Sequence, residues 1–110
     1  MNELPIEITP EEVADLRKGE MPLRLIDVRE PEEHAVCHID GATLIPMQSI
    51  PERINELDRS DTRIVLFCHH GVRSLSAVDW LRRQGVKNCQ SMAGGIDLWS
   101  LTIDRAVPRY

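Results

Sequence analysis

The apolar residues of the chain fall into short runs that are separated by turn-forming residues. Nearly continuous apolar runs at 23–28 and 64–67 are typical of strands that are buried on both faces of a parallel sheet. Shorter or weaker runs at 5–8, 44–45 and 89–92 predict three further strands. We expect 64–67 to be the central strand, because it is the most uniformly apolar of the five.

The segments between these strands have helical character. Thr9, Pro10 and Glu12 combine a capping box with proline at the first helical position, which predicts a helix over 10–18 that ends at Gly19. Further helices are expected over 31–36, 47–57 and 74–84, with a short one that ends near Trp99. Strands that alternate with helices predict an α/β fold with a mostly parallel sheet flanked by helices. The last residues show no clear period.

Length and composition limit the class of protein. A chain of 110 residues has the commonest size of one domain, so we expect a single domain over residues 1–110. With 42% hydrophobic and 28% charged residues, the composition is that of a soluble globular protein. No apolar run approaches the roughly 20 residues that span a bilayer, and no secretion signal is recognisable at the start. We therefore expect a cytoplasmic protein without a membrane partner.

The charges are unevenly distributed. A net charge of −5 argues against a general nucleic-acid binder, which needs a basic face. Residues 1–33 hold 10 of the 18 acidic and 4 of the 13 basic residues, so the negative excess lies in this part of the chain. An anionic substrate would meet less repulsion at the remaining two-thirds, where the strongest candidate site lies.

Cys68 directly follows the strand expected at 64–67, and a helix is expected shortly after it. Ligands of parallel sheets bind beyond the carboxyl ends of the strands. The N–H groups of a tight loop and of a helix start create a positive potential, which favours a thiolate over a thiol. A cysteine that only packs in the core is the alternative interpretation. The loop and helix favour Cys68 as a nucleophile.

The residues after Cys68 are the predicted substrate-binding loop: His69, His70, Gly71, Val72, Arg73 and Ser74. Gly71 permits a backbone angle that strains other residues, and Arg73 adds a permanent cation. Ser74 either caps the following helix or donates to a bound anion. His69 and His70 add charge or hydrogen bonds according to their protonation, or else are solvated loop residues.

Several separated motifs together resemble the rhodanese family, and the resemblance covers nearly the whole chain. The matching segments are 27–30 with 32–34, 38–42, the loop 68–74, and 94–96 with Trp99. The resemblance implies a three-layer rhodanese-like fold and a sulfurtransferase in which Cys68 takes sulfane sulfur from a small anionic donor such as thiosulfate. A thiol, cyanide or a protein acceptor then removes the sulfur from the Cys68 persulfide, without a metal or organic cofactor.

The resemblance also assigns supporting residues. Asp27 and Arg29 are expected to support the active-site loop rather than to react, with a surface ion pair or a helix cap as the alternative. Gly94, Gly95 and Trp99 are interpreted as structural, through a turn and a packed indole.

The other two cysteines are open to more than one interpretation. The family often has glycine where this chain has Cys37, and glycine would suit a helix end. Cys37 therefore brings local strain, supplies a second thiol near the site, or is simply packed. Cys89 lies in a weak strand and is expected to pack.

Three rival functions are compatible with the same residues. A phosphatase or arsenate reductase also uses a cysteine in an anion-binding loop, but Cys68 and Arg73 are separated by four residues where tyrosine phosphatases have five, so we expect poor phosphatase activity. A metal site is the second rival, with candidate ligands His34, Cys37, His38, Cys68, His69 and His70. The third rival is a binding module or a sulfur relay for one protein partner.

Overall fold

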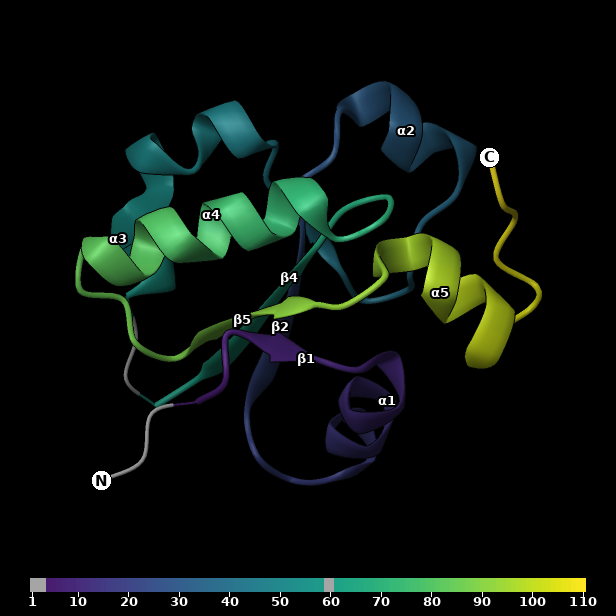
Figure 1. Cartoon of the computed structure of the whole chain (residues 1–110), viewed down its shortest axis with the longest axis horizontal. Helices are drawn as coiled ribbons and strands as arrows, with labels where there is room; N and C mark the ends of the chain where they lie inside the picture. Colours follow the sequence, from purple (N-terminus) through teal and green to yellow (C-terminus); the bar gives the residue numbers. More distant parts are fainter. Residues whose placement is uncertain (1–3, 59–60) are drawn as a thin grey trace.

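The computed structural model describes residues 4–58 and 61–110, and its centre is a five-stranded sheet in the order β1-β5-β4-β2-β3 (Figure 1). The strands are β1 (Glu7–Ile8), β2 (Leu23–Asp27), β3 (Thr43–Leu44), β4 (Arg63–Phe67) and β5 (Cys89–Met92). Each neighbouring pair of these strands is parallel. The predicted sheet is confirmed, with β4 in the middle of the strand order.

Helices cover both faces of the sheet. They are α1 (Pro10–Lys18), α2 (Pro31–Val36), α3 (Ile54–Leu57), α4 (Val72–Arg83) and α5 (Gly95–Thr102). Figure 1 shows α3 and α4 on one side of the strands and α1 and α5 on the other, which confirms the three-layer α/β fold. Among the described residues no helix is both long and apolar enough to cross a membrane.

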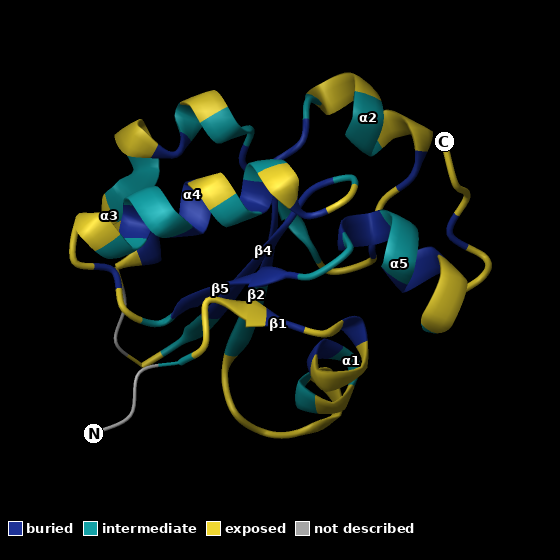
Figure 2. Cartoon of the chain, viewed as in Figure 1, coloured by how far each residue is buried: buried dark blue, intermediate teal, exposed yellow. Residues whose placement is uncertain are grey.

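The core is divided by the sheet into two clusters, because successive side chains of a strand point to opposite faces. Ile64 and Leu66 of β4 belong to one cluster, and Val65 and Phe67 belong to the other. The first cluster includes residues of α4 and the second includes residues of α1 and α5. The sheet is accordingly the most continuously buried part of the molecule (Figure 2).

The prediction of one continuous helix over 47–57 is wrong. The chain instead forms two 3-10 turns, Met47–Ser49 and Pro51–Arg53, followed by the short helix α3. Pro51 explains the break, because proline donates no backbone hydrogen bond and its ring clashes with the carbonyl four residues before it in a continuous helix. The apolar residues of the segment still recur at a helical spacing, so Ile50 and Leu57 are buried in the core.

Smaller differences concern the ends of elements. The third strand is Thr43–Leu44, one residue earlier than expected, and α5 extends to Thr102. Helix α4 begins at Val72, two residues before the predicted start. Gly19 follows α1 as predicted, and with φ −87° it ends the helix in an ordinary backbone conformation.

Candidate active site

Cys68 lies just beyond the carboxyl end of β4, and its side chain faces the beginning of α4. The residue is 1% exposed. Its sulfur accepts backbone hydrogen bonds from the N–H of Gly71 at 3.1 Å and from the N–H of Ser74 at 3.4 Å. The sulfur thus sits where the N–H groups of a helix start converge, an arrangement that stabilises negative charge.

Gly71 has the left-handed conformation that its position in the loop suggested. Its φ is +100°, it caps the N-terminus of α4, and a Cβ atom there would lie 3.1 Å from the backbone N of Gly94. Glycine is required by both the angle and this close approach. Gly71 therefore lets the chain turn tightly enough to direct its own N–H at the Cys68 sulfur.

Ser74 is not the cap of the helix, contrary to one of the two expectations. It is the third residue of α4, and the capping residue is Gly71. The Ser74 hydroxyl is buried and lies 3.6 Å from the Cys68 sulfur, 3.3 Å from the carbonyl oxygen of Gly71 and 2.7 Å from the hydroxyl of Ser91. Ser74 thus provides a backbone donor and a hydroxyl beside the sulfur.

The loop rests on the N-terminus of α5. The N–H of Ile96 donates to the carbonyl of Cys68 at 2.9 Å, and the N–H of Asp97 donates to the carbonyl of His69 at 3.1 Å. A Cβ atom on Gly95, which has φ +60°, would collide with both carbonyl oxygens. Gly95 is therefore structural as expected, through a close approach of two backbones as well as through a turn.

The cation of Arg73 is held by a carboxylate that the sequence analysis did not identify. Both terminal nitrogens of Arg73 bind Glu33 of α2, at 2.6 and 2.9 Å. Hydrogen bonds from Arg73 hold the pKa of Glu33 far below its ordinary value, and the same bonds raise the pKa of Arg73. Arg73 is therefore a cation beside the site whose charge is largely balanced.

Asp27 and Arg29 form an ion pair that is fully buried, so the surface pair considered as an alternative is wrong. Both side chains are 0% exposed, and Arg29 binds Asp27 through two nitrogens at 2.9 and 2.7 Å. Burial disfavours the charged form of Arg29, but hydrogen bonds with Asp27 and Tyr110 outweigh it and raise the pKa of Arg29. Arg29 also donates to the carbonyls of Cys37 and Glu33.

These contacts define how Asp27 and Arg29 relate to the loop. The side-chain contacts of the pair lead to α2, Cys37, Tyr110 and the ring of Phe67, which directly precedes the loop, and within the described residues none leads to 68–74 itself. The support of the loop that the resemblance implies for Asp27 and Arg29 stays a prediction, and these neighbours are its expected route.

Tyr110 joins three parts of the site, and sequence reasoning missed it. Its hydroxyl donates to Glu33 at 2.7 Å and accepts from Arg29 at 2.9 Å. Its ring stacks on the imidazole of His69, with the two ring centroids 3.9 Å apart. Burial, with Glu33 adding to it, raises the pKa of Tyr110 to about 12. No local pattern marked Tyr110, because the end of the chain has neither a strand nor a helix period.

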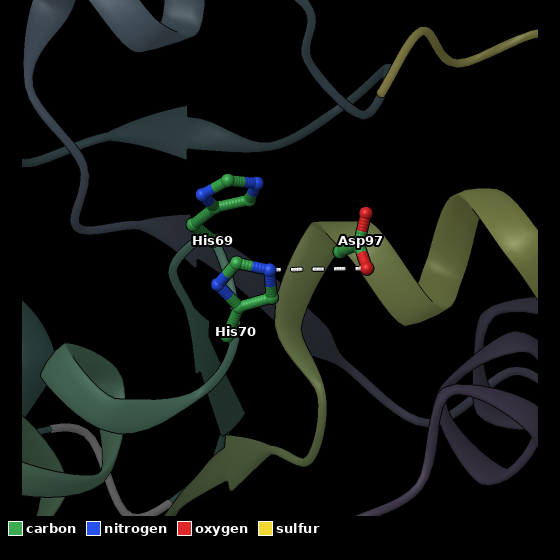
Figure 3. Close-up of side chains that lie close together, drawn as sticks. All are labelled: His69, His70 and Asp97. Carbon is green, nitrogen blue, oxygen red and sulfur yellow. Dashed lines mark ion pairs between the residues drawn. The ribbon is translucent and has the colours of Figure 1, made fainter. Parts of the chain in front are cut away.

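His69, His70 and Asp97 form a polar cluster at the rim of the loop (Figure 3). Figure 3 shows the two imidazoles side by side, with His70 directed at Asp97 of α5. The ion pair joins His70 Nε2 to Asp97 Oδ2 at 3.8 Å. Burial and the neighbouring His70 lower the pKa of His69. Within the described residues, His69 Nε2 is a buried side-chain atom without a recorded hydrogen-bond partner.

This cluster is also the group of potential metal ligands found among the described residues, with ligand atoms within 4.8 Å of one another. Tetrahedral zinc holds its ligand atoms roughly 3.3 Å apart. Arg109 already binds both oxygens of Asp97, at 2.8 and 3.3 Å. The cluster is therefore arranged as an ion-pair network more than as a metal centre.

The metal site suggested by six histidines and cysteines is not assembled. Helix α2 ends at Val36, so Cys37 and His38 lie beyond the helix, although the rings of His34 and His38 stack with their centroids 5.0 Å apart. His34 directs Nδ1 at Asp27, 3.0 Å away. The cluster that forms at the rim contains His69 and His70 but neither cysteine.

Cys37 and Cys89 are both buried and free. Cys37 has φ −161°, an extended backbone that any residue adopts, so the local strain considered for it is absent. It packs in the core cluster that contains Phe67, whereas Cys68 packs in the cluster on the other face of the sheet. Burial raises the pKa of Cys89, which begins β5 at the end of the sheet away from Cys68.

The fold and the loop define a class of protein: a parallel α/β domain with a cysteine that faces backbone N–H groups at a helix start. The family model for the Rhodanese-like domain matches residues 9–102. The chain belongs to this family.

Relatives and solved structures agree with this assignment. The chain is 37% identical over 92 residues to the thiosulfate sulfurtransferase GlpE of Pseudomonas aeruginosa, covering 84% of this chain and 81% of that one. It is 40% identical over 95 residues to "Probable adenylyltransferase/sulfurtransferase MoeZ" of Mycobacterium tuberculosis, of which it spans 24%. A crystal structure of a rhodanese-like domain protein from Staphylococcus aureus superposes with a TM-score of 0.80 at 30% identity, covering 94% and 97% of the two chains.

Proposed function

We propose that the protein is a sulfurtransferase that carries sulfur as a persulfide on Cys68. The observation that carries the proposal is the pair of backbone N–H groups, from Gly71 and Ser74, that point at the Cys68 sulfur at the start of α4. A thiolate carries its negative charge at this sulfur and therefore gains from these donors, whereas a persulfide anion carries its charge on the outer sulfur bonded to it. Similarity to a protein named thiosulfate sulfurtransferase supports thiosulfate as a donor.

The reaction consists of two displacements at sulfur. In the first, the Cys68 thiolate attacks the outer sulfur of thiosulfate, and the bond between that sulfur and the sulfonate sulfur breaks. The leaving group takes the electron pair as sulfite. In the second, cyanide or a thiolate attacks the terminal sulfur of the persulfide and releases the Cys68 thiolate. Such alternation of a free and a substituted enzyme predicts ping-pong kinetics.

The burial of Cys68 favours small donors and allows larger acceptors. The residue is 1% exposed, so the donor must deliver its outer sulfur into the loop. The new sulfur–sulfur bond is about 2 Å long, so the reactive atom lies that much farther from the Cys68 backbone. Val72, in the same loop, is 74% exposed, so the rim is open to a larger molecule. A protein thiol that accepts sulfur in a relay is therefore compatible with the site.

A phosphatase is less well supported by the site. The four-residue spacing between Cys68 and Arg73 forms a shorter loop than the phosphatase pattern, which suits a sulfur atom better than a tetrahedral phosphate. We also propose that residues 69–74 bind the substrate. The proposal includes a single domain that acts in the cytoplasm.

The proposal is tested by the intact mass of the protein before and after exposure to thiosulfate. We expect a gain of roughly 32 Da, one sulfur atom, on a cysteine nucleophile. Cyanide should reverse the gain, and Cys68→Ala should abolish it. Cys37→Ala and Cys89→Ala are matched controls, because each removes a buried thiol and leaves Cys68 in place.

The outcomes distinguish an error in the assigned nucleophile from an absence of sulfur transfer. A gain that persists in Cys68→Ala would show that another thiol reacts and would overturn the assignment of Cys68. If the native protein gains no mass from thiosulfate or from a persulfide donor such as glutathione persulfide, sulfur transfer itself is rejected.

A further inference from the structure

Ser91 is a buried hydroxyl of β5 that reaches the active site through a second hydroxyl. It is 0% exposed, and its backbone is fixed between β1 and β4 by pairing with Glu7 and Leu66. Its side-chain oxygen lies 2.7 Å from the hydroxyl of Ser74. Within the described residues this is the recorded partner of the Ser91 hydroxyl, and a buried hydroxyl without a partner is costly.

A count of hydrogens assigns the direction of this bond. Ser74 has one hydroxyl hydrogen and three neighbours: the Gly71 carbonyl at 3.3 Å, the Ser91 hydroxyl at 2.7 Å and the Cys68 sulfur at 3.6 Å. The carbonyl can only accept, and a thiolate can only accept. The hydroxyl hydrogen of Ser91 has the Ser74 oxygen as its acceptor. The arrangement satisfies every group when Ser91 donates to Ser74 and the Ser74 hydrogen remains available to Gly71 or to sulfur.

We propose that Ser91 is a positioning residue for sulfur transfer: it donates to the Ser74 hydroxyl and so leaves the Ser74 hydrogen free for the negatively charged sulfur on Cys68. The proposal rests on the function proposed above. When Cys68 is a thiol, the Ser74 hydrogen binds the Gly71 carbonyl and the thiol donates to Ser74. When the thiol proton is lost to solvent, the Ser74 hydroxyl rotates and becomes a third donor beside the two backbone N–H groups.

The effect of Ser91 is separable from the charges around the loop. Arg73 of α4 is the cation that attracts the Cys68 sulfur, and Glu33 of α2 binds that cation. His69 and His70 lie in the loop itself, with Asp97 of α5 beside them. Ser91→Ala changes none of these charges. It removes one donor from a chain of hydroxyls, in which each bond polarises the next.

The test is the rate at which iodoacetamide alkylates Cys68, followed as a function of pH and assigned to Cys68 by peptide mass spectrometry. Ser91→Ala is expected to move the midpoint of the profile to higher pH and to lower the rate at neutral pH roughly twofold, because it removes the polarisation of the Ser74 hydroxyl and no hydrogen bond to sulfur itself. Ser74→Ala should have at least this effect. In the Ser74→Ala background, adding Ser91→Ala should change nothing further.

Ser100→Ala is the matched control. Ser100 is also a buried serine, 4% exposed, whose hydroxyl donates to the carbonyl of Val107 at 2.5 Å. It should lower the melting temperature without moving the alkylation profile. Ser91→Ala removes a single oxygen atom, so the variant is expected to fold, and its melting temperature is recorded beside the profile.

Two results would overturn the proposal. An unchanged profile in Ser91→Ala would mean that Ser91 only packs. An equal shift in the native and Ser74→Ala backgrounds would mean that Ser91 acts without Ser74. Alkylation needs no sulfur donor, so either result is distinct from a failure of the mass test with thiosulfate. If sulfur is transferred, persulfide formation should fall by the same factor as alkylation.

Discussion

The surroundings of the Cys68 sulfur and those of the neighbouring Arg29 guanidinium are built on opposite principles. The sulfur lies among neutral groups, namely two backbone N–H donors and the Ser74 hydroxyl, to which the Cys68 thiol donates. Arg29 lies in a network with the ionised groups of Asp27, Glu33 and Arg73, which the neutral hydroxyl of Tyr110 helps to connect. Both environments are largely buried, and they meet at the loop that carries His69 and Arg73.

The difference follows from what each region has to do. A group whose charge changes during a reaction is best served by donors that are fixed before the charge appears. Backbone N–H groups at a helix start meet this condition and carry no net charge of their own. A permanent charge such as Arg29 instead needs a permanent counter-charge when it leaves water. We therefore expect the charged network to contribute mainly to stability and the backbone donors mainly to reactivity.

The largest expected effect is on the buried ion pair. Arg29→Met leaves the Asp27 carboxylate buried without its partner, so we expect a loss of about 3–5 kcal/mol in the free energy of unfolding, measured in urea. Arg53→Met is the control, because Arg53 pairs with Glu56 on the exposed surface, where solvent screens the pair and its loss should have little effect. Equal losses in the two variants would contradict the distinction.

The next effect tests the backbone side of the comparison. Gly95→Ala places a methyl group against the carbonyls of Cys68 and His69 at a left-handed φ of +60°, so we expect a loss of roughly 2–4 kcal/mol together with a slower reaction of Cys68. Gly85→Ala is the control. Its φ is +98°, but no atom lies within 4 Å of the added carbon, so it should cost about 1 kcal/mol and leave the reactivity of Cys68 unaltered.

Tyr110→Phe removes the hydroxyl between Arg29 and Glu33 and keeps the ring. We expect a loss of about 1 kcal/mol at neutral pH. Because the pKa of Tyr110 is raised from 10.0 to about 12 in the folded state, its contribution is present below pH 10 and is lost as the pH rises toward 12. The chain has one tyrosine, so tyrosinate absorbance reports Tyr110 alone. A titration midpoint near 10 in the folded protein would contradict this contact.

The smallest expected effect is on donor binding. Glu33→Gln keeps an acceptor for the Tyr110 hydroxyl but removes the charge that balances Arg73, so the KM for thiosulfate should fall roughly threefold, and less at high salt. Glu56→Gln, in the exposed pair with Arg53, is the control and should leave the KM unchanged. A higher KM in Glu33→Gln would show that Glu33 acts mainly by positioning the loop and not by balancing the charge of Arg73.

The local pattern of the sequence was sufficient wherever short-range forces decide the structure. The capping box before α1, Pro31 before α2 and the apolar run before Cys68 each act within a few residues, and the structure confirms those elements. Where two local signals competed, as at Pro51 within an apolar helical period, the steric restriction of proline overrode the period. Resemblance of separated motifs added the family and the expected sulfur chemistry.

Only the tertiary structure decided which distant groups share a partner. Glu33 meets Arg73 across 40 positions of sequence, Tyr110 meets Arg29 across 81, and Ser91 meets Ser74 across 17. Hydrogen bonds and ion pairs depend on ångström-scale separations that the packing of α2, the C-terminal residues and β5 onto one loop sets. The sequence by itself determined the strand, the turn and the thiol, while the fold determined which charges and hydroxyls surround them.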